Sequence, residues 1–381
     1  MMAKNTSVSP NSFIRHHTLL LILFIMKTSR SFFPLFLIVS ISIILFPSHA
    51  QKSTSSRLSS QEEGVFNRKD SLRLLCIGNS YSLDATIYLP QMIADAGIKN
   101  NQYCIYCATS AGASLAFWDS ILVNDHPIPH LYHMGGSLWS PKQKNWKIRE
   151  ILREPWDVII LQQASRVSEE YETYVPYIGN LLEAIHNECP NKDVKIGWHM
   201  TWTHAQNHPD KPYGDTGWIN ISNTTKKLLQ TYDIPFMIPS STSIQNARHT
   251  QLNDDLELTR DGSHIAYGIG RYMLALTWFE VICQPIFGCS MIGTAPSATL
   301  CSIDADKEPF YAITQDNYLI CQECVQNAIK APYSCSDPFT NIIMPKENMK
   351  TEDKLFDISG RPIFRIPNKG IYIKGKNKEI R

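Results

Sequence analysis

The sequence carries a serine on one polar turn and an Asp–His pair on another, and these residue types together can perform nucleophilic catalysis. In "LRLLCIGNSYSLDATIYLPQMIADAG", residues 72–97, an apolar run gives way to G-N-S-Y-S around Ser80. Much further along, "TRDGSHIAYGIGRYMLAL" has Asp261 and His264 in a D-x-x-H arrangement. A serine hydroxyl is a weak nucleophile until a histidine takes its proton and a carboxylate orients that histidine. We therefore expect Ser80 to attack, His264 to act as the base and Asp261 to orient it.

Ser80 also has a purely structural interpretation. A serine between a strand and a helix often caps the helix, and the pattern here predicts a helix over 84–97, with Asp84 near its start and Gly97 as its stop. The Asp–His pair at the other end of the same region favours the nucleophile over the cap.

A reaction of this kind needs donors for an oxyanion, and the ends of three predicted strands offer them. Ligands of open parallel sheets bind beyond the carboxyl ends of the strands. The first strand leads to Ser80, the second to Gly112, and the third, in "WDVIILQQAS", to Gln162 and Gln163. We expect the backbone N–H groups of Ser80 and Gly112 and the side-chain amide of Gln162 to form the oxyanion hole, with Gln163 as the alternative to Gln162.

Strand and helix patterns alternate along the chain, which predicts a three-layer α/β/α domain with a mainly parallel sheet. The expected strands are 72–77, the segment that ends near 112, 158–161, "KIGWHMTW" and "IPFMIPSS". The expected helices are 84–97, 173–188, 217–232, 265–282 and 313–331, and residues 116–147 are expected to form loops and short helices.

The amino terminus has the pattern of a targeting segment. The apolar run "FFPLFLIVSISIILF", residues 32–46, follows basic residues and precedes "PSHA", which suits cleavage before Gln51. We therefore interpret residues 1–50 as a secretory signal peptide, with Met26 as an alternative start, and residues 51–70 as a polar linker. A retained membrane anchor is the rival interpretation, but the apolar run is short for a span.

The overall charge excludes some classes of partner. The 381 residues include 36 basic and 35 acidic ones, for a net charge of +1, so no global field recruits nucleic acid or an anionic membrane. The ten cysteines could form disulfides in an exported protein. Two C-x-x-C pairs lack an accompanying histidine pair, so we do not expect a zinc site. The expected serine mechanism requires neither a metal nor an organic cofactor.

Three blocks of the sequence resemble a known superfamily. "GNSYS" before a helix, Gly112 after the second strand and "DGSHIAYG" near the domain's end are similar to the SGNH, or GDSL-type, hydrolases. "VIILQQAS", "WHMTW" and "DGSHIAYGIGRY" resemble an uncharacterised branch of secreted bacterial SGNH-like proteins over about residues 71–335. The resemblance implies a flavodoxin-like α/β/α sandwich and a catalytic role for Ser80, Asp261 and His264.

The chain departs from the superfamily in two places. Asn79 stands where the aspartate before the serine is usual, and "LQQAS" stands where the third block usually has G-x-N-D. We expect Asn79, Trp202 and His199 to contribute to substrate binding around the nucleophile.

The last part of the chain differs in pattern from the hydrolase-like region, which we place at 71–340. Residues 341–381 alternate apolar residues with turn glycines and finish on basic residues, which predicts a short β-rich tail. Its end resembles the C-terminal tails of exported proteins of bacteria that use type IX secretion.

Together these features indicate an exported serine esterase that removes small acyl groups, acetyl in particular, from a small-molecule or carbohydrate ester. The location would be periplasmic, on the cell surface or extracellular, without stable membrane insertion after signal cleavage. One alternative is a carbohydrate-binding protein on an inactive SGNH scaffold. Another is an acyltransferase or lipid esterase, which would need a broad apolar mouth.

Overall fold

The computed structural model describes residues 65–135, 138–142 and 145–335, and four short strands between residues 355 and 380. The chain divides into two units, Met1–Lys52 and Ser53–Arg381, and all the described residues belong to the second. The expected signal peptide and most of the expected linker therefore lie outside the described residues.

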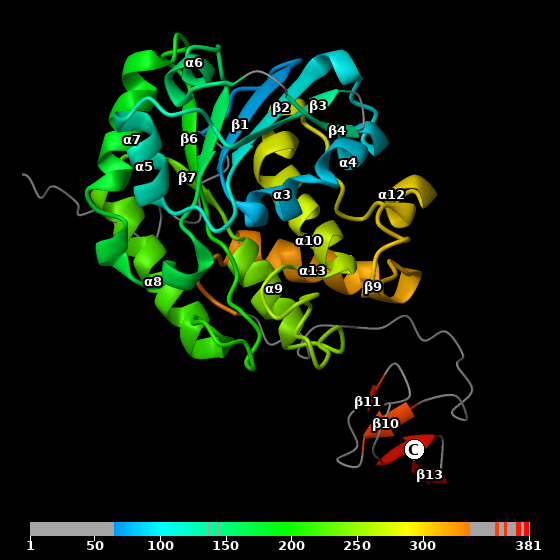
Figure 1. The fold of residues 1–381 in the computed structure, drawn as a ribbon. Helices are drawn as coiled ribbons and strands as arrows, with labels where there is room; N and C mark the ends of the chain where they lie inside the picture. Colours follow the sequence, from blue (N-terminus) through cyan, green and yellow to red (C-terminus); the bar gives the residue numbers. More distant parts are fainter. Residues whose placement is uncertain are drawn as a thin grey trace, which may run out of the picture. The chain divides into compact units, whose positions relative to one another are not determined.

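A seven-stranded sheet forms the centre of the domain, in the order β4-β3-β2-β1-β5-β6-β7 (Figure 1). Five strands are parallel and two at one edge are antiparallel. The parallel strands are β1 (Leu72–Gly78), β2 (Tyr103–Thr109), β5 (Val158–Leu161), β6 (Lys195–His199) and β7 (Phe236–Ile238), and the antiparallel ones are β3 (His130–Gly135) and β4 (Leu138–Pro141). Counted along the chain, the parallel strands lie in the order 2-1-3-4-5, which is the flavodoxin-like order. The expected fold class is confirmed.

Side chains of β1 alternate between two apolar cores, one on each face of the sheet. Leu72, Leu74 and Cys76 belong to one cluster of buried residues, and Leu75 and Ile77 belong to the other. Both sets are at most 1% exposed. A strand that is apolar on both faces must be covered on both, as parallel strands of α/β proteins are.

Helices cover each face of the sheet (Figure 1). The Leu75 face packs against α5 (Leu115–Val123), α6 (Ile148–Leu152), α7 (Tyr177–Glu188) and α8 (Gly214–Thr231). The Leu74 face packs against α3 (Ser80–Thr86), α4 (Leu89–Asp95), α9 (Ser240–Arg248), α10 (Ile269–Trp278), a π-helical turn (Phe279–Cys283), α11 (Gln284–Phe287), α12 (Ala298–Ser302) and α13 (Gln315–Lys330). A short parallel pair, β8 (Tyr267–Gly268) and β9 (Phe310–Tyr311), lies outside the main sheet.

The expected helix over 84–97 is two helices, and it begins earlier than expected. The first, α3, starts at Ser80 because Asn79 caps it, and the second, α4, has Pro90 in its first turn. Proline has no N–H to continue a preceding helix but is tolerated in a first turn. The nucleophile candidate is therefore the first residue of a helix.

Three other segments also differ from the expectation. Residues 116–147 were expected to form loops and short helices, but they contain β3 and β4, which extend the sheet beyond β2. The expected helix over 265–282 begins at Ile269 and continues through the π-helical turn. The pattern did not predict α9, whose polar residues are all buried between α8, α10 and α13.

The carboxyl-terminal strands form a separate four-stranded antiparallel sheet in the order β11-β10-β12-β13. They are β10 (Leu355–Asp357), β11 (Pro362–Ile363), β12 (Ile371–Lys374) and β13 (Asn377–Ile380). The β structure expected from the alternating pattern is present.

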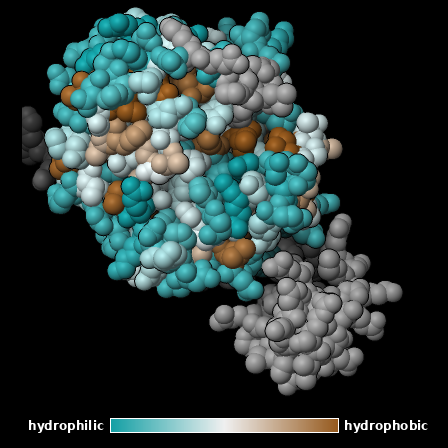
Figure 2. All heavy atoms as spheres, viewed as in Figure 1, coloured by the Kyte–Doolittle hydropathy of each residue, from teal (hydrophilic) through white to brown (hydrophobic). Residues whose placement is uncertain are grey.

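The surface of the domain is mainly hydrophilic on the face that Figure 2 shows, with hydrophobic residues in small separate groups. Among the helices that the structure describes, none combines the length and apolar content that a membrane span requires.

Candidate active site

The nucleophile candidate stands at the junction between β1 and α3. Asn79 has an extended backbone, with φ −141° and ψ −158°, and its side-chain oxygen accepts a hydrogen bond from the Tyr81 N–H at 2.9 Å. Gly78 precedes it where no side chain fits, because a Cβ there would lie 2.2 Å from Ser82 Oγ and 2.8 Å from Gln162 Cδ. The sequence G-N-S thus ends the strand, caps the helix and leaves Ser80 half-buried at the carboxyl edge of the sheet.

The structure brings Ser80, His264 and Asp261 together in one chain of contacts. His264 Nε2 lies 2.8 Å from Ser80 Oγ, and His264 Nδ1 lies 2.7 Å from Asp261 Oδ2. The side chains of His264 and Asp261 are 30% and 50% exposed. This order of hydroxyl, imidazole and carboxylate is the one that activates a serine nucleophile.

The Asp261 carboxylate is held ionised by the loop that carries it. Burial acts to raise its pKa, but hydrogen bonds from the His264 N–H, the His264 ring and the Ser263 N–H outweigh burial and lower the pKa. The two backbone bonds both reach Asp261 Oδ1, at 2.7 Å from His264 and 3.0 Å from Ser263. The other oxygen is left to orient the imidazole.

Two stacked aromatic rings hold the loop that carries Asp261 and His264. Tyr81 and Trp202 are parallel, with ring centroids 4.0 Å apart. The Tyr81 hydroxyl donates to the Ser263 carbonyl at 2.8 Å, and Trp202 Nε1 donates to the same carbonyl at 2.9 Å. The residue next to His264 is therefore fixed to the helix that begins with Ser80. We expected Trp202 to bind substrate, but it is 0% exposed, and that expectation is corrected to a supporting role.

Gln162 lies inside the fold beneath the nucleophile. Its Nε2 donates to Asn79 Oδ1 at 2.7 Å, and its Oε1 contacts Ser82 Oγ at 2.5 Å and His199 Nδ1 at 3.1 Å. Gln162 is 1% exposed. Because both ends of the amide have partners in the interior, the expected role of Gln162 as an oxyanion donor is corrected: it connects the Asn79 cap to the next strand.

Asn79 and His199 belong to the same buried network. They are 2% and 0% exposed, so the structure does not present either to a substrate as we expected. The Asn79 Nδ2 donates to the Ala113 carbonyl at 3.0 Å, and His199 Nε2 lies 3.0 Å from Ser240 Oγ. Burial lowers the pKa of His199 from 6.5 to about 3, which keeps the ring neutral at ordinary pH.

Gln163 does not replace Gln162 at the oxyanion position. Its Oε1 accepts from the Leu115 and Ala164 N–H groups at 3.0 and 2.8 Å, and its Nε2 donates to the Thr173 carbonyl at 3.0 Å. It is 1% exposed and links β5 to the start of α5. The expectation that Gln163 is the alternative oxyanion donor is therefore also corrected, because both ends of its amide have partners in the interior.

The backbone N–H groups of Ser80 and Gly112 remain as the candidates for oxyanion donors. Gly112 is exposed and has φ +60°, a left-handed conformation that glycine adopts without strain. The turn is fixed by the bond from Asn79 to Ala113, the residue after Gly112. Within the described part of the chain, the N–H groups of Ser80 and Gly112 have no hydrogen-bond partner.

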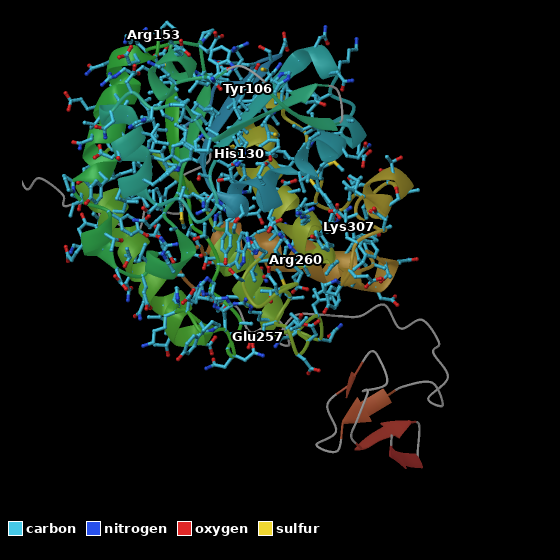
Figure 3. All side chains as sticks on the ribbon, viewed as in Figure 1. Tyr106, His130, Arg153, Glu257, Arg260 and Lys307 are labelled. Atoms are coloured by element: carbon cyan, nitrogen blue, oxygen red, sulfur yellow. The ribbon has the colours of Figure 1, made fainter. Side chains whose placement is uncertain are left out.

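A buried charge network behind the site was not anticipated from the sequence. Arg260, labelled in Figure 3, donates to both oxygens of Asp84 at 3.1 and 3.0 Å, and Arg271 donates to Asp84 Oδ1 at 2.6 Å. Arg271 also bonds Asp304 at 2.5 Å. The ring of Tyr267 lies 4.7 Å from each guanidinium. The only sequence signals were the positions of Asp84 and Arg260, four residues after Ser80 and one before Asp261.

Nowhere in the described part of the chain do three or more histidine, cysteine, aspartate or glutamate side chains come together as a metal site. All ten cysteines are free thiols, so the structure contains none of the disulfides that the sequence allowed.

The strand order and the Ser–His–Asp chain define an α/β/α protein with the catalytic geometry of serine hydrolases. Residues 73–291, more than half of the chain, match the family described as "Domain of unknown function (DUF4886)", and the protein belongs to that family. A solved DUF4886 family protein from Bacteroides uniformis is 26% identical over 71% of this chain and 98% of its own, with a TM-score of 0.59.

More distant structures include two esterases. A carbohydrate esterase family 3 protein from Talaromyces cellulolyticus is 12% identical over 57% of this chain and 100% of its own, with a TM-score of 0.38. A carbohydrate acetylesterase from Xanthomonas citri is 13% identical over 56% of this chain and 42% of its own, with a TM-score of 0.30. Likenesses of this degree carry no functional argument here. No curated protein matches the chain.

Proposed function

We propose that the protein is an exported serine esterase of SGNH type, which hydrolyses small acyl esters, acetyl esters in particular, on carbohydrate. The observation that carries the proposal is the unbroken chain from Ser80 Oγ through His264 to Asp261, at 2.8 and 2.7 Å. A cap serine would not need a histidine at hydrogen-bonding distance, oriented in turn by a carboxylate.

The geometry supports a two-step acyl transfer to water. His264 Nε2 takes the Ser80 proton as Oγ attacks the ester carbonyl, and Asp261 stabilises the imidazolium that forms. The N–H groups of Ser80 and Gly112 bind the oxyanion. His264 then donates the proton to the leaving alcohol, and a water, activated by the same imidazole, releases the acyl group and regenerates Ser80.

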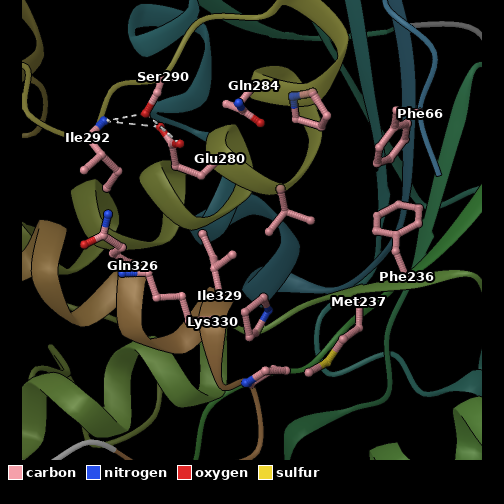
Figure 4. A pocket seen from close by; sticks show the side chains of 14 residues that line it. Phe66, Phe236, Met237, Glu280, Gln284, Ser290, Ile292, Gln326, Ile329 and Lys330 are labelled. Carbon is pink, nitrogen blue, oxygen red and sulfur yellow. Dashed lines mark hydrogen bonds between the residues drawn. The ribbon is translucent and has the colours of Figure 1, made fainter. Parts of the chain in front are cut away.

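Exposure of the site favours a small acyl group on a larger carrier. Half of the Asp261 side chain is exposed, and Ser80 and His264 are only partly covered. Such an open site suits an acyl group that projects from a bulky alcohol such as a sugar, whereas a long acyl chain needs an apolar channel. The cavity of about 550 Å³ in Figure 4 is lined by residues including Phe66, Phe236 and Lys330, and it shares no residue with the triad.

The test is labelling of the purified mature protein by a fluorophosphonate, followed by hydrolysis assays with acetylated glycosides and with chromogenic esters of graded chain length. We expect labelling at Ser80, no labelling of Ser80→Ala, and rates that fall as the acyl chain lengthens. Absence of both labelling and hydrolysis would favour the alternative of a binding protein on an inactive scaffold, and faster hydrolysis of long chains would favour a lipid esterase.

A further inference from the structure

A short turn after β5 lies beside Gly112, one of the proposed oxyanion donors. It is the 3-10 turn Ser165–Val167. Burial raises the pKa of the Tyr81 hydroxyl, and the side chains of Ser263 and Ser165 act in the opposite direction. The next residue, Arg166, reaches the oxyanion turn, where its Nη1 lies 3.4 Å from the Gly112 carbonyl oxygen.

The end of the Arg166 side chain packs closely against Gly112. A Cβ on Gly112 would lie 3.1 Å from Arg166 Nη1. The guanidinium contacts the carbonyl of Gly112 rather than its N–H, so it leaves the proposed oxyanion donor open. It adds positive charge beside that donor.

The other arginines near the site have partners inside the fold, and Arg166 is different. Arg260 and Arg271 are paired with Asp84, and Arg248 is buried against Thr203. Arg166 is exposed, and among the described residues it forms no ion pair. Its one hydrogen bond is at the long limit of the range. A guanidinium has five donors in a planar fork that matches a carboxylate.

We propose that Arg166 binds a carboxylate of the substrate beside the scissile ester, so that the preferred substrates are acyl esters of acidic sugars of the uronic acid class. This proposal rests on the proposed esterase function and adds the substrate class. The net charge of +1 provides no long-range field, so recognition of an anion must come from a local cation such as this one. Arg166 acts as a specificity residue, because it touches the carrier rather than the reacting carbonyl.

The test compares an acetylated uronic acid glycoside with the corresponding uronamide, which has the same shape and no charge. Arg166→Gln should lower the ratio of kcat/KM for the uronate to kcat/KM for the uronamide by about ten- to a hundredfold, since hydrogen bonds to charged groups are among the stronger ones. Arg166→Lys should retain part of the preference. The matched control is Arg153→Gln. Arg153 is an exposed arginine that precedes β5, at the amino end of the strand, so this substitution should leave the ratio of the two kcat/KM values unchanged.

Binding measured without turnover separates this proposal from the esterase function. Calorimetry of Ser80→Ala with a uronic acid oligosaccharide should show binding that weakens by a similar factor when Arg166→Gln is added. The proposal is overturned if the ratio is unchanged in Arg166→Gln, if both substrates lose activity equally, or if the Ser80→Ala protein binds the oligosaccharide equally well with and without Arg166. Loss of hydrolysis with Arg166-dependent binding retained would instead reject the esterase and keep the acidic-sugar site.

Discussion

Arg260 holds both carboxylate oxygens of Asp84, and this pair joins the two segments that carry the proposed catalytic residues. Asp84 lies on α3, whose first residue is Ser80, and Arg260 immediately precedes Asp261. Arg260 Nη1 also donates to the Ile265 carbonyl at 2.6 Å. The same guanidinium therefore connects the two ends of the loop that contains Asp261 and His264. The distance between nucleophile and base therefore depends on a buried ion pair outside the triad.

Asp84→Asn should both destabilise the fold and slow catalysis. Asp84 is 1% exposed, and its replacement leaves Arg260 without a carboxylate partner and Arg271 with Asp304 alone. Removing one partner of a buried ion pair typically costs about 3–5 kcal/mol. Urea unfolding measures the first effect and kcat the second. The control is Glu154→Gln, which breaks the partly exposed pair with Arg73 and should cost about 1 kcal/mol or less. Equal costs for the two substitutions would show that the Asp84 network does not hold the loop.

The mature protein should begin at or near Gln51. The apolar run over 32–46 and the "SHA" ending predict cleavage by a signal peptidase. Mass spectrometry of the protein recovered from outside the cytoplasm measures its first residue. Retention of residues 32–46 in that protein would mean a membrane anchor instead.

Local sequence patterns predicted the residues that the structure brings together. Ser80 follows the end of a buried strand, and the D-x-x-H spacing allows Asp261 and His264 to meet within one turn. Because the carboxyl ends of parallel strands lie at the same edge of the sheet, residues that follow different strands could be predicted to lie close together even when they are far apart in sequence. The alternation of strands and helices predicted a mainly parallel sheet, whereas the flavodoxin-like arrangement was implied by the resemblance to SGNH hydrolases.

Burial of individual polar side chains could not be predicted in this way. Gln162, Trp202 and His199 all follow or end strands at the correct edge, but whether such a side chain faces solvent or the interior depends on partners distant in sequence. His199, for example, is enclosed by Gln162 and by Ser240 of α9, a helix that the pattern did not indicate. The strand β3 was missed because its pairing with β2 is a long-range contact in a segment rich in turn residues, and β4 was missed with it because β4 pairs with β3.

Gln162→Ala should lower stability together with activity. The variant removes the donor to Asn79 Oδ1 and the acceptor for Ser82 and His199, and buried groups left without partners cost about 1–3 kcal/mol each. We expect a loss of unfolding free energy in urea and a moderate loss of kcat through displacement of the cap. If kcat instead falls by about two to three orders of magnitude at unchanged stability, Gln162 is the oxyanion donor after all.

The neutral state of His199 should make the protein less stable in mild acid. The pKa of His199 is about 3 in the folded protein and 6.5 in the unfolded chain. The contribution of His199 to the free energy of unfolding is therefore full above pH 6.5 and is lost as the pH falls toward 3. From pH 7 to pH 5 the loss from this one group is about 2 kcal/mol. Urea unfolding at both pH values should show this dependence in the wild type. His199→Gln should show much less of it, and the exposed His186→Gln should behave as the wild type does. An identical pH dependence in all three proteins would assign the acid sensitivity to other groups.

Substitutions in the triad should have non-additive effects on kcat, and the three residues Ser80, His264 and Asp261 should differ in the size of the loss. Ser80→Ala removes the nucleophile and His264→Ala removes its base, so each should lower kcat for ester hydrolysis by several orders of magnitude, and the double variant should be hardly slower than either. Asp261→Asn loses the carboxylate that orients the ring, although the N–H groups of Ser263 and His264 can still bind the amide oxygen and hold the loop. It should therefore remain folded and lose activity chiefly in kcat. Each variant is checked for native unfolding behaviour before its rates are compared. Wild-type rates in Ser80→Ala would reject the triad and leave G-N-S as a turn that ends β1 and caps α3.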